Sequence, residues 1–86
     1  MGKYNLKIKK SAAKELAKVP QPDLRRIIDK IQNLAIDPRP ASSQKLSNFE
    51  LYRLRQGDYR IVYSVNDVDI VIEIIKIGHR RDVYKF

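Results

Sequence analysis

Residues 51–63 read LYRLRQGDYRIVY, which is the pattern of a β-hairpin. Apolar and polar side chains alternate on both sides of the dipeptide Gly57-Asp58, and a period of two is typical of half-buried strands. A two-residue connection with glycine in first place favours a type II′ turn. The stretch therefore predicts two antiparallel strands, at residues 49–56 and 59–65, and a fold built around a sheet.

The length of this turn sets which side chains share a face of the hairpin. With a two-residue turn, Arg55 pairs with Arg60, and Arg53 lies two positions away on the same face. A three-residue turn would instead move Arg60 to the other face. The opposite face carries the apolar side chains, which are Tyr52, Leu54, Ile61 and Tyr63, joined by Ile70, Ile72 and Ile74 of a later strand.

The remaining elements follow from the same patterns. Residues 4–9 alternate as a strand, and apolar residues recur at helical spacing in residues 11–19 and 22–35. Residues 37–43 have the composition of a loop, and residues 69–77 read as the last strand. The expected fold is α+β: a strand, two helices and a three-strand antiparallel meander, which form a four-stranded sheet with the helices packed on one face.

Composition narrows the classes of function. The 86 residues, 43% of them hydrophobic, predict a single domain spanning residues 1–86. Eighteen Lys and Arg against ten Asp and Glu give a net charge of +8, so an anionic partner is expected. With no cysteine and one histidine, a disulfide framework and a zinc cluster are excluded, and we expect no metal and no cofactor. The absence of a membrane-spanning apolar run and of a signal peptide predicts a cytoplasmic protein with no membrane contact.

The arginines of the hairpin need an explanation. Like charges directly across a strand pair destabilise it, which makes Arg55 opposite Arg60 an unfavourable choice for stability alone. In the expected register Glu73 lies opposite Arg60 and would neutralise the cluster as a surface salt bridge. The alternative is a face that binds an anion such as phosphate, and the residues alone leave both interpretations open.

Residues 78–86 read GHRRDVYKF and add further cationic and aromatic side chains at the end of the last strand. His79, Arg80, Arg81 and Tyr84 each have an ordinary structural explanation when taken singly. Several arginines around a tyrosine suit the stabilisation of a phosphoryl transition state. RNA cleavage is the simplest such reaction, because RNA supplies its own 2′-hydroxyl nucleophile. A protein that only binds nucleic acid would use the same residue types.

Residues 51–63, taken with residues 77–84 (IGHRRDVY), resemble the RelE/ParE toxin superfamily and specifically its RelE branch. The expected order of strand, helix, helix and three strands extends the resemblance over the whole chain. It implies a toxin of a type II toxin–antitoxin system, a metal-independent endoribonuclease that cleaves messenger RNA in the ribosomal A site and so inhibits translation. It also implies a RelB-like antitoxin that holds the toxin inactive, and a toxin–antitoxin complex that binds operator DNA through the antitoxin.

The resemblance also implies roles for individual residues. Arg60 and Arg80 match the phosphate-stabilising arginines of the family, and Tyr84 matches the tyrosine that orients or activates the 2′-hydroxyl or stacks on the substrate base. The residues expected to bind RNA are Arg53, Arg55, Arg81 and His79. The first two of these are often lysines in the family. A guanidinium does not readily lose a proton at neutral pH, so we expect them to bind charge rather than to act as general bases.

Two other functions stay open. A ParE-like inhibitor of DNA gyrase would have no nuclease activity, and an inactive relative would only bind RNA. The combination of Arg60, Arg80 and Tyr84 favours the nuclease, because a protein that only binds another protein has no chemical need for that set. A nuclease should stop translation, a gyrase inhibitor should block replication, and an inactive relative should do neither.

Overall fold

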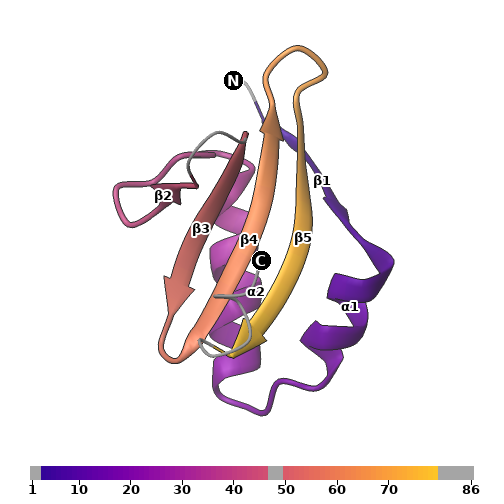
Figure 1. The fold of residues 1–86 in the computed structure, drawn as a ribbon, viewed down its shortest axis with the longest axis vertical. Helices are drawn as coiled ribbons and strands as arrows, with labels where there is room; N and C mark the ends of the chain where they lie inside the picture. Colours follow the sequence, from indigo (N-terminus) through magenta and orange to yellow (C-terminus); the bar gives the residue numbers. More distant parts are fainter. Residues whose placement is uncertain (1–2, 47–49, 80–86) are drawn as a thin grey trace.

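The computed structural model describes residues 3–46 and 50–79, and these form a mixed sheet with two helices (Figure 1). The elements in chain order are β1 (Asn5–Ile8), α1 (Lys10–Ala17), α2 (Asp23–Leu34), β2 (Gln44–Lys45), β3 (Leu51–Gln56), β4 (Tyr59–Asn66) and β5 (Val71–His79). The strand order across the sheet is β1-β5-β4-β3-β2, with β1 parallel to β5 and the other pairs antiparallel. The predicted α+β class and element order are confirmed. The sheet has five strands rather than four, because the short β2, directly after the expected loop, adds to the edge of β3.

The β3–β4 hairpin has the predicted register. Arg55 pairs with Arg60, and Gln56 pairs with Tyr59 on either side of a two-residue turn. Gly57 has a φ of +58°, as the first position of a type II′ turn requires. L residues rarely adopt this conformation, so glycine at this position fixes the turn and with it the register.

Replacing Gly57 with alanine should lower the free energy of unfolding by about 1 kcal/mol, because a Cβ atom disfavours a positive φ. The added Cβ would lie 3.6 Å from the Asp23 Oδ1 atom, which is an ordinary contact, so the loss would come from backbone strain. Urea denaturation can compare this variant with Asp58→Ala, a change in the same turn at a residue without a positive φ. A Gly57→Ala variant as stable as Asp58→Ala would show that the turn is not strained.

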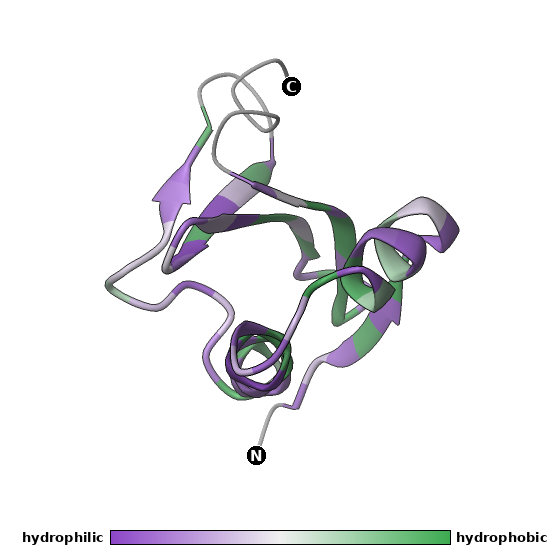
Figure 2. Cartoon of the chain, turned by 90° about the horizontal axis from the view of Figure 1, so that it is seen from below, coloured by the Kyte–Doolittle hydropathy of each residue, from purple (hydrophilic) through white to green (hydrophobic). Residues whose placement is uncertain are grey.

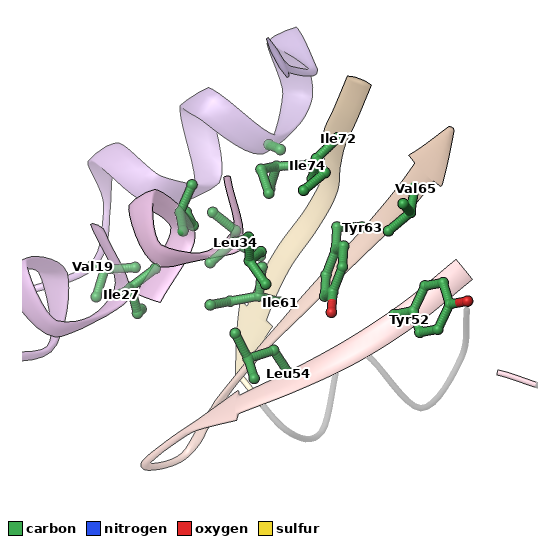
Figure 3. Close-up of a cluster of buried hydrophobic side chains, with 13 residues drawn as sticks. Val19, Ile27, Leu34, Tyr52, Leu54, Ile61, Tyr63, Val65, Ile72 and Ile74 are labelled. Carbon is green, nitrogen blue, oxygen red and sulfur yellow. The ribbon is translucent and has the colours of Figure 1, made fainter. Parts of the chain in front are cut away.

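The core lies between one face of the sheet and the helices. Figure 2 shows α2 end-on beneath the curved sheet, with α1 beside the strands. Ile27, Ile31 and Leu34 recur at spacings of four and three along α2 and are buried. In Figure 3 the α2 side chains lie against those of the sheet, among them Ile61. In the described part of the chain, neither helix has the length and apolar run that a membrane crossing requires.

The last strand starts two residues later than predicted and contains a β-bulge. Tyr63 of β4 pairs with Ile74. Its neighbour Val62 pairs with Lys76, which leaves Ile75 as an extra residue on β5. Because the extra residue shifts the alternation of the strand, the buried side chains of β5 are Ile72, Ile74 and Ile77.

The prediction that Ile70 joins the core is wrong. Ile70 precedes β5, has a φ of +57° and is 38% exposed. Its carbonyl oxygen accepts a hydrogen bond of 2.9 Å from the backbone N–H of Asn5. The residue therefore contributes its backbone to the junction with β1 rather than its side chain to the core.

A side chain of helix α1 covers the edge of β5 beyond the point where β1 ends. β1 pairs only with Val71 to Ile74 of β5. Beyond that point the Glu15 carboxylate of α1 accepts hydrogen bonds of 2.9 Å from the Ile77 N–H and from the Lys76 ammonium. The side chain thus takes the place of a strand partner for the open edge of β5.

Candidate functional site

Three arginines lie on the face of the sheet opposite the helices. Arg53 and Arg55 flank the core residue Leu54 in β3, and Arg60 precedes the core residue Ile61 in β4. Alternation along the strands therefore turns all three away from the core. They border a hollow of about 390 Å³, whose lining residues include Ala41, Ser42, Gln44, Arg53, Arg55 and Arg60.

Arg60 is the buried member of this group. It is only 4% exposed, and its Nη1 atom donates to the carbonyl oxygens of Gly57 at 3.4 Å and Tyr59 at 3.2 Å. None of the ion pairs found within residues 3–46 and 50–79 includes Arg60. Its hydrogen-bond partners in the hairpin are neutral, so the guanidinium contributes a positive charge to the hollow.

The neutralising salt bridge expected from Glu73 is not formed. Glu73 pairs with Ser64, whereas Arg60 pairs with Gly78. Positions four residues apart on a strand are separated by about 13 Å, which is beyond the reach of an ion pair. Arg55 and Arg60 therefore face each other without this compensation.

The short strand β2 adds polar groups to the hollow. Gln44 pairs with Arg53 in the ladder, and the Arg53 Nη2 atom donates to the Gln44 Oε1 atom at 2.7 Å. Ser42, in the loop before β2, is a further lining residue. Sequence reasoning missed Gln44 because a two-residue strand produces no periodic signal, and it missed Ser42 because a loop residue has no periodic pattern at all.

His79 lies elsewhere. It pairs with Tyr59, and the two rings meet edge to face with centroids 5.8 Å apart. Tyr59 packs against the core, so His79 is on the helix side of the sheet, where a separate hollow of about 290 Å³ is also lined by Lys18 and Lys76. The structure brings Arg53, Arg55 and Arg60 together but does not bring His79 into their hollow.

The other predicted site residues cannot be placed in this way. They lie outside the described residues and are Arg80, Arg81 and Tyr84.

A second polar cluster joins the loop after α2 to the turn between β4 and β5. Arg39 makes a forked pair with Asp67, with Nη1 at 3.3 Å and Nη2 at 2.8 Å from its carboxylate oxygens. The Arg39 Nε atom donates to the Tyr52 hydroxyl at 2.8 Å, and the Tyr4 hydroxyl donates to Asp67 at 2.7 Å. Sequence reasoning missed this cluster, because its members come from four separate segments of the chain.

The hydrogen bonds of this second cluster shift the pKa values of its members. Hydrogen bonds from Arg39 and then from Tyr4 lower the pKa of Asp67, and the hydrogen bond to Asp67 raises the pKa of Tyr4. The same pairing raises the pKa of Arg39. At neutral pH, Asp67 is therefore an anion, Arg39 is a cation and Tyr4 keeps its donor proton.

Comparison with known proteins matches nearly the whole chain. A family model described as the ParE toxin of the type II toxin–antitoxin system parDE matches residues 6–84. The putative toxin RelE1 of Methanocaldococcus jannaschii is 32% identical over 87 residues, which cover 96% of this chain and 97% of the relative.

Solved structures share the fold. The archaeal RelE–RelB complex from Pyrococcus horikoshii contains a chain with a TM-score of 0.82 and 38% identity, covering 93% of this chain and 97% of that chain. The isolated E. coli toxin RelE has a TM-score of 0.79 and 26% identity, covering 95% and 92% respectively. The similarity thus extends from sequence to three-dimensional structure.

Proposed function

The chain belongs to the RelE/ParE superfamily of toxins from type II toxin–antitoxin systems, and we propose that it is a ribosome-dependent endoribonuclease. In this proposal the 2′-hydroxyl of a messenger RNA in the ribosomal A site attacks the adjacent phosphate. The products are a 2′,3′-cyclic phosphate and a 5′-hydroxyl, and translation stops.

The observation that carries this proposal is the pairing of Arg55 with Arg60 beside a hollow. In a two-residue hairpin this pair occupies a non-hydrogen-bonded position, where Cα atoms are about 4.5 Å apart. Like charges on side chains directly opposite each other destabilise a strand pair, and a bound phosphate would relieve the repulsion between the two arginines. A cluster that lowers stability when empty and raises it with a bound anion is expected at a functional site, and it supports a role in contacting the RNA backbone.

The proposed roles of the residues follow from charge and rigidity. Arg60, buried and held by its own hairpin, neutralises the charge that develops on the phosphate in the transition state, and Arg80 assists it. Tyr84 orients or activates the 2′-hydroxyl. Substrate binding is assigned to Arg53 and Arg55 in the hollow and to Arg81. His79, on the helix side of the sheet, is assigned a contact with RNA outside the hollow. We propose no metal for this step, because the RNA supplies the nucleophile and the arginines supply the positive charge.

We also propose a cognate RelB-like antitoxin. The relative from Pyrococcus horikoshii was solved as a RelE–RelB complex. A net charge of +8 suits an acidic or amphipathic chain that wraps the toxin and covers the arginine hollow. In this proposal the complex binds operator DNA through the antitoxin.

A second candidate function is inhibition of DNA gyrase. It is favoured by one finding, that the matching family model is described as a ParE toxin. A gyrase inhibitor would act by binding a protein surface, and it would leave messenger RNA intact.

Two assays on the purified protein separate the candidates. We expect the protein to stop synthesis of a reporter in a cell-free translation system and to leave DNA supercoiling by gyrase unchanged. Loss of supercoiling with normal translation would favour the gyrase inhibitor. Activity in neither assay, with RNA binding retained, would favour the inactive relative.

A further inference from the structure

The loop between α2 and β2 links the Arg39 cluster to the arginine hollow. Arg39 is tied to Asp67 and Tyr52, and two residues later Ala41 becomes part of the wall of the hollow. The wall continues through Ser42 to Gln44, which contacts Arg53. Residues 39–44 therefore contain both an anchor, which is Arg39 with its hydrogen bonds to Asp67 and Tyr52, and one wall of the candidate site.

The anchor is attached to the core. The Arg39 guanidinium lies over the Tyr52 ring, 5.2 Å from its centroid, and Tyr52 is buried and stacks on Tyr63 at 5.6 Å. The Tyr63 hydroxyl in turn donates to the carbonyl oxygen of Pro38 at 2.8 Å. The residue before Arg39 and Arg39 itself are thus both held by buried tyrosines of adjacent strands.

The segment beyond the anchor has few free torsions. Ser43 donates to the carbonyl oxygen of Pro40 through both its hydroxyl, at 2.8 Å, and its backbone N–H, at 2.9 Å. Gln44 then enters the ladder opposite Arg53. Only the turn from Pro40 to Ser43 lies between Arg39 and Gln44, so we expect a displacement of Arg39 to reach Gln44.

We propose that Arg39 is a positioning residue of the arginine hollow, which acts through residues 40–44 on Arg53. Its forked pair with Asp67 fixes the position of residues 41–44, which form one wall of the hollow. The hydrogen bond between Gln44 and Arg53 then fixes the position of the Arg53 guanidinium. The effect on substrate binding rests on the proposed function, in which the hollow binds an RNA phosphate.

Charge alone predicts the opposite result from positioning. Asp67→Asn removes a negative charge, and long-range electrostatics would then tighten the binding of RNA. If the carboxylate instead holds Arg39 in place, the same change weakens binding. Arg39→Lys tests the fork at constant net charge, because an ammonium group cannot reproduce the planar set of donors.

The test measures the affinity of each variant for a short 2′-O-methyl RNA, which cannot be cleaved, together with the NMR signal of the Arg53 Nε–Hε group. We expect Asp67→Asn and Arg39→Lys each to weaken binding by about fivefold and to shift or broaden the Arg53 signal. The matched control is Asp69→Asn, which makes the same charge change in the same turn. Within the described residues, the Asp69 carboxylate accepts a side-chain hydrogen bond from the Asn66 Nδ2 atom and has no hydrogen bond or ion pair with Arg39. This control should bind RNA at least as tightly as the native protein and leave the Arg53 signal unchanged.

Thermal unfolding is followed for every variant, and affinities are compared at a temperature at which all are folded. An unchanged Arg53 signal in both Arg39→Lys and Asp67→Asn would overturn the inference, as would Asp67→Asn binding RNA as tightly as Asp69→Asn. Native binding that survives Arg55→Ala unchanged would count against the proposed function instead, because the RNA would then not occupy the arginine hollow. The Arg53 signal would still decide whether Arg39 positions the hollow.

Discussion

Replacing Arg60 with alanine should slow cleavage of ribosome-bound messenger RNA by about 100-fold or more. Hydrogen bonds to the carbonyl oxygens of Gly57 and Tyr59 hold Arg60, so under the proposed mechanism its charge is in place before the reaction begins. Pre-arranged charge of this kind lowers the energy of the transition state most, because no reorganisation is needed as the reaction proceeds. The measurement is the single-turnover rate of cleavage on programmed ribosomes.

The matched control for this change is Arg26→Ala, which removes the same charge from an exposed position on α2. It should reduce the rate only by weakening general attraction to RNA, an effect that added salt removes. Unfolding curves of Arg60→Ala are needed beside the rates, because the side chain is buried. A folded Arg60→Ala protein that cuts at the rate of the Arg26→Ala protein would exclude Arg60 from the chemistry.

Replacing Ile27 with alanine should lower the free energy of unfolding by about 3 kcal/mol. Ile27 has no exposed surface and belongs to the buried hydrophobic cluster, in which Figure 3 shows it beside Val19. The truncation loses buried apolar area and leaves a cavity, and the two losses add. Urea denaturation followed by circular dichroism measures the difference.

The exposed Ile36, at 69% exposure, provides the same chemical change outside the core. Its replacement by alanine should alter the free energy of unfolding by less than about 0.5 kcal/mol. Equal losses for Ile27→Ala and Ile36→Ala would mean that α2 does not form the core described above.

The hairpin was predictable because its signals are local. Gly57 and Asp58 specify a two-residue turn, and this turn fixes the pairing of Arg55 with Arg60. The face that carries the arginines then follows from alternation alone. The class of fold and the order of its elements could be predicted from the same short-range patterns.

The position of β5 could not be predicted in this way. Its pairing depends on the bulge at Ile75, and a run of β-branched residues on both sides of that position gives no sign of where the alternation breaks. The displacement of Glu73 has a different cause, because residues 67–70 form a longer connection between Asn66 and Val71 than a two-residue turn. A two-residue turn at Asn66 and Asp67 would place Glu73 opposite Arg60, whereas the observed connection places it opposite Ser64. Because Glu73 does not lie opposite Arg60, a neutralising salt bridge from Glu73 does not explain the pairing of Arg55 with Arg60.

The residues that form and support the wall of the candidate site could not be predicted from the sequence either. Gln44 belongs to a strand too short for any periodic signal, and Arg39 finds its carboxylate 28 residues away at Asp67. Such contacts are set by how distant segments pack. The roles proposed for Arg80 and Tyr84 came from resemblance to a family, because no pattern of spacing assigns chemistry to them.

The central claim is that this protein cuts messenger RNA only on the ribosome. Primer extension on a translated messenger, with and without ribosomes, tests it most directly, with Arg80→Ala and Tyr84→Ala measured beside the native protein. We predict cuts within codons that require ribosomes and that disappear in both variants. An intact messenger, or the same cuts on free RNA, would contradict the claim.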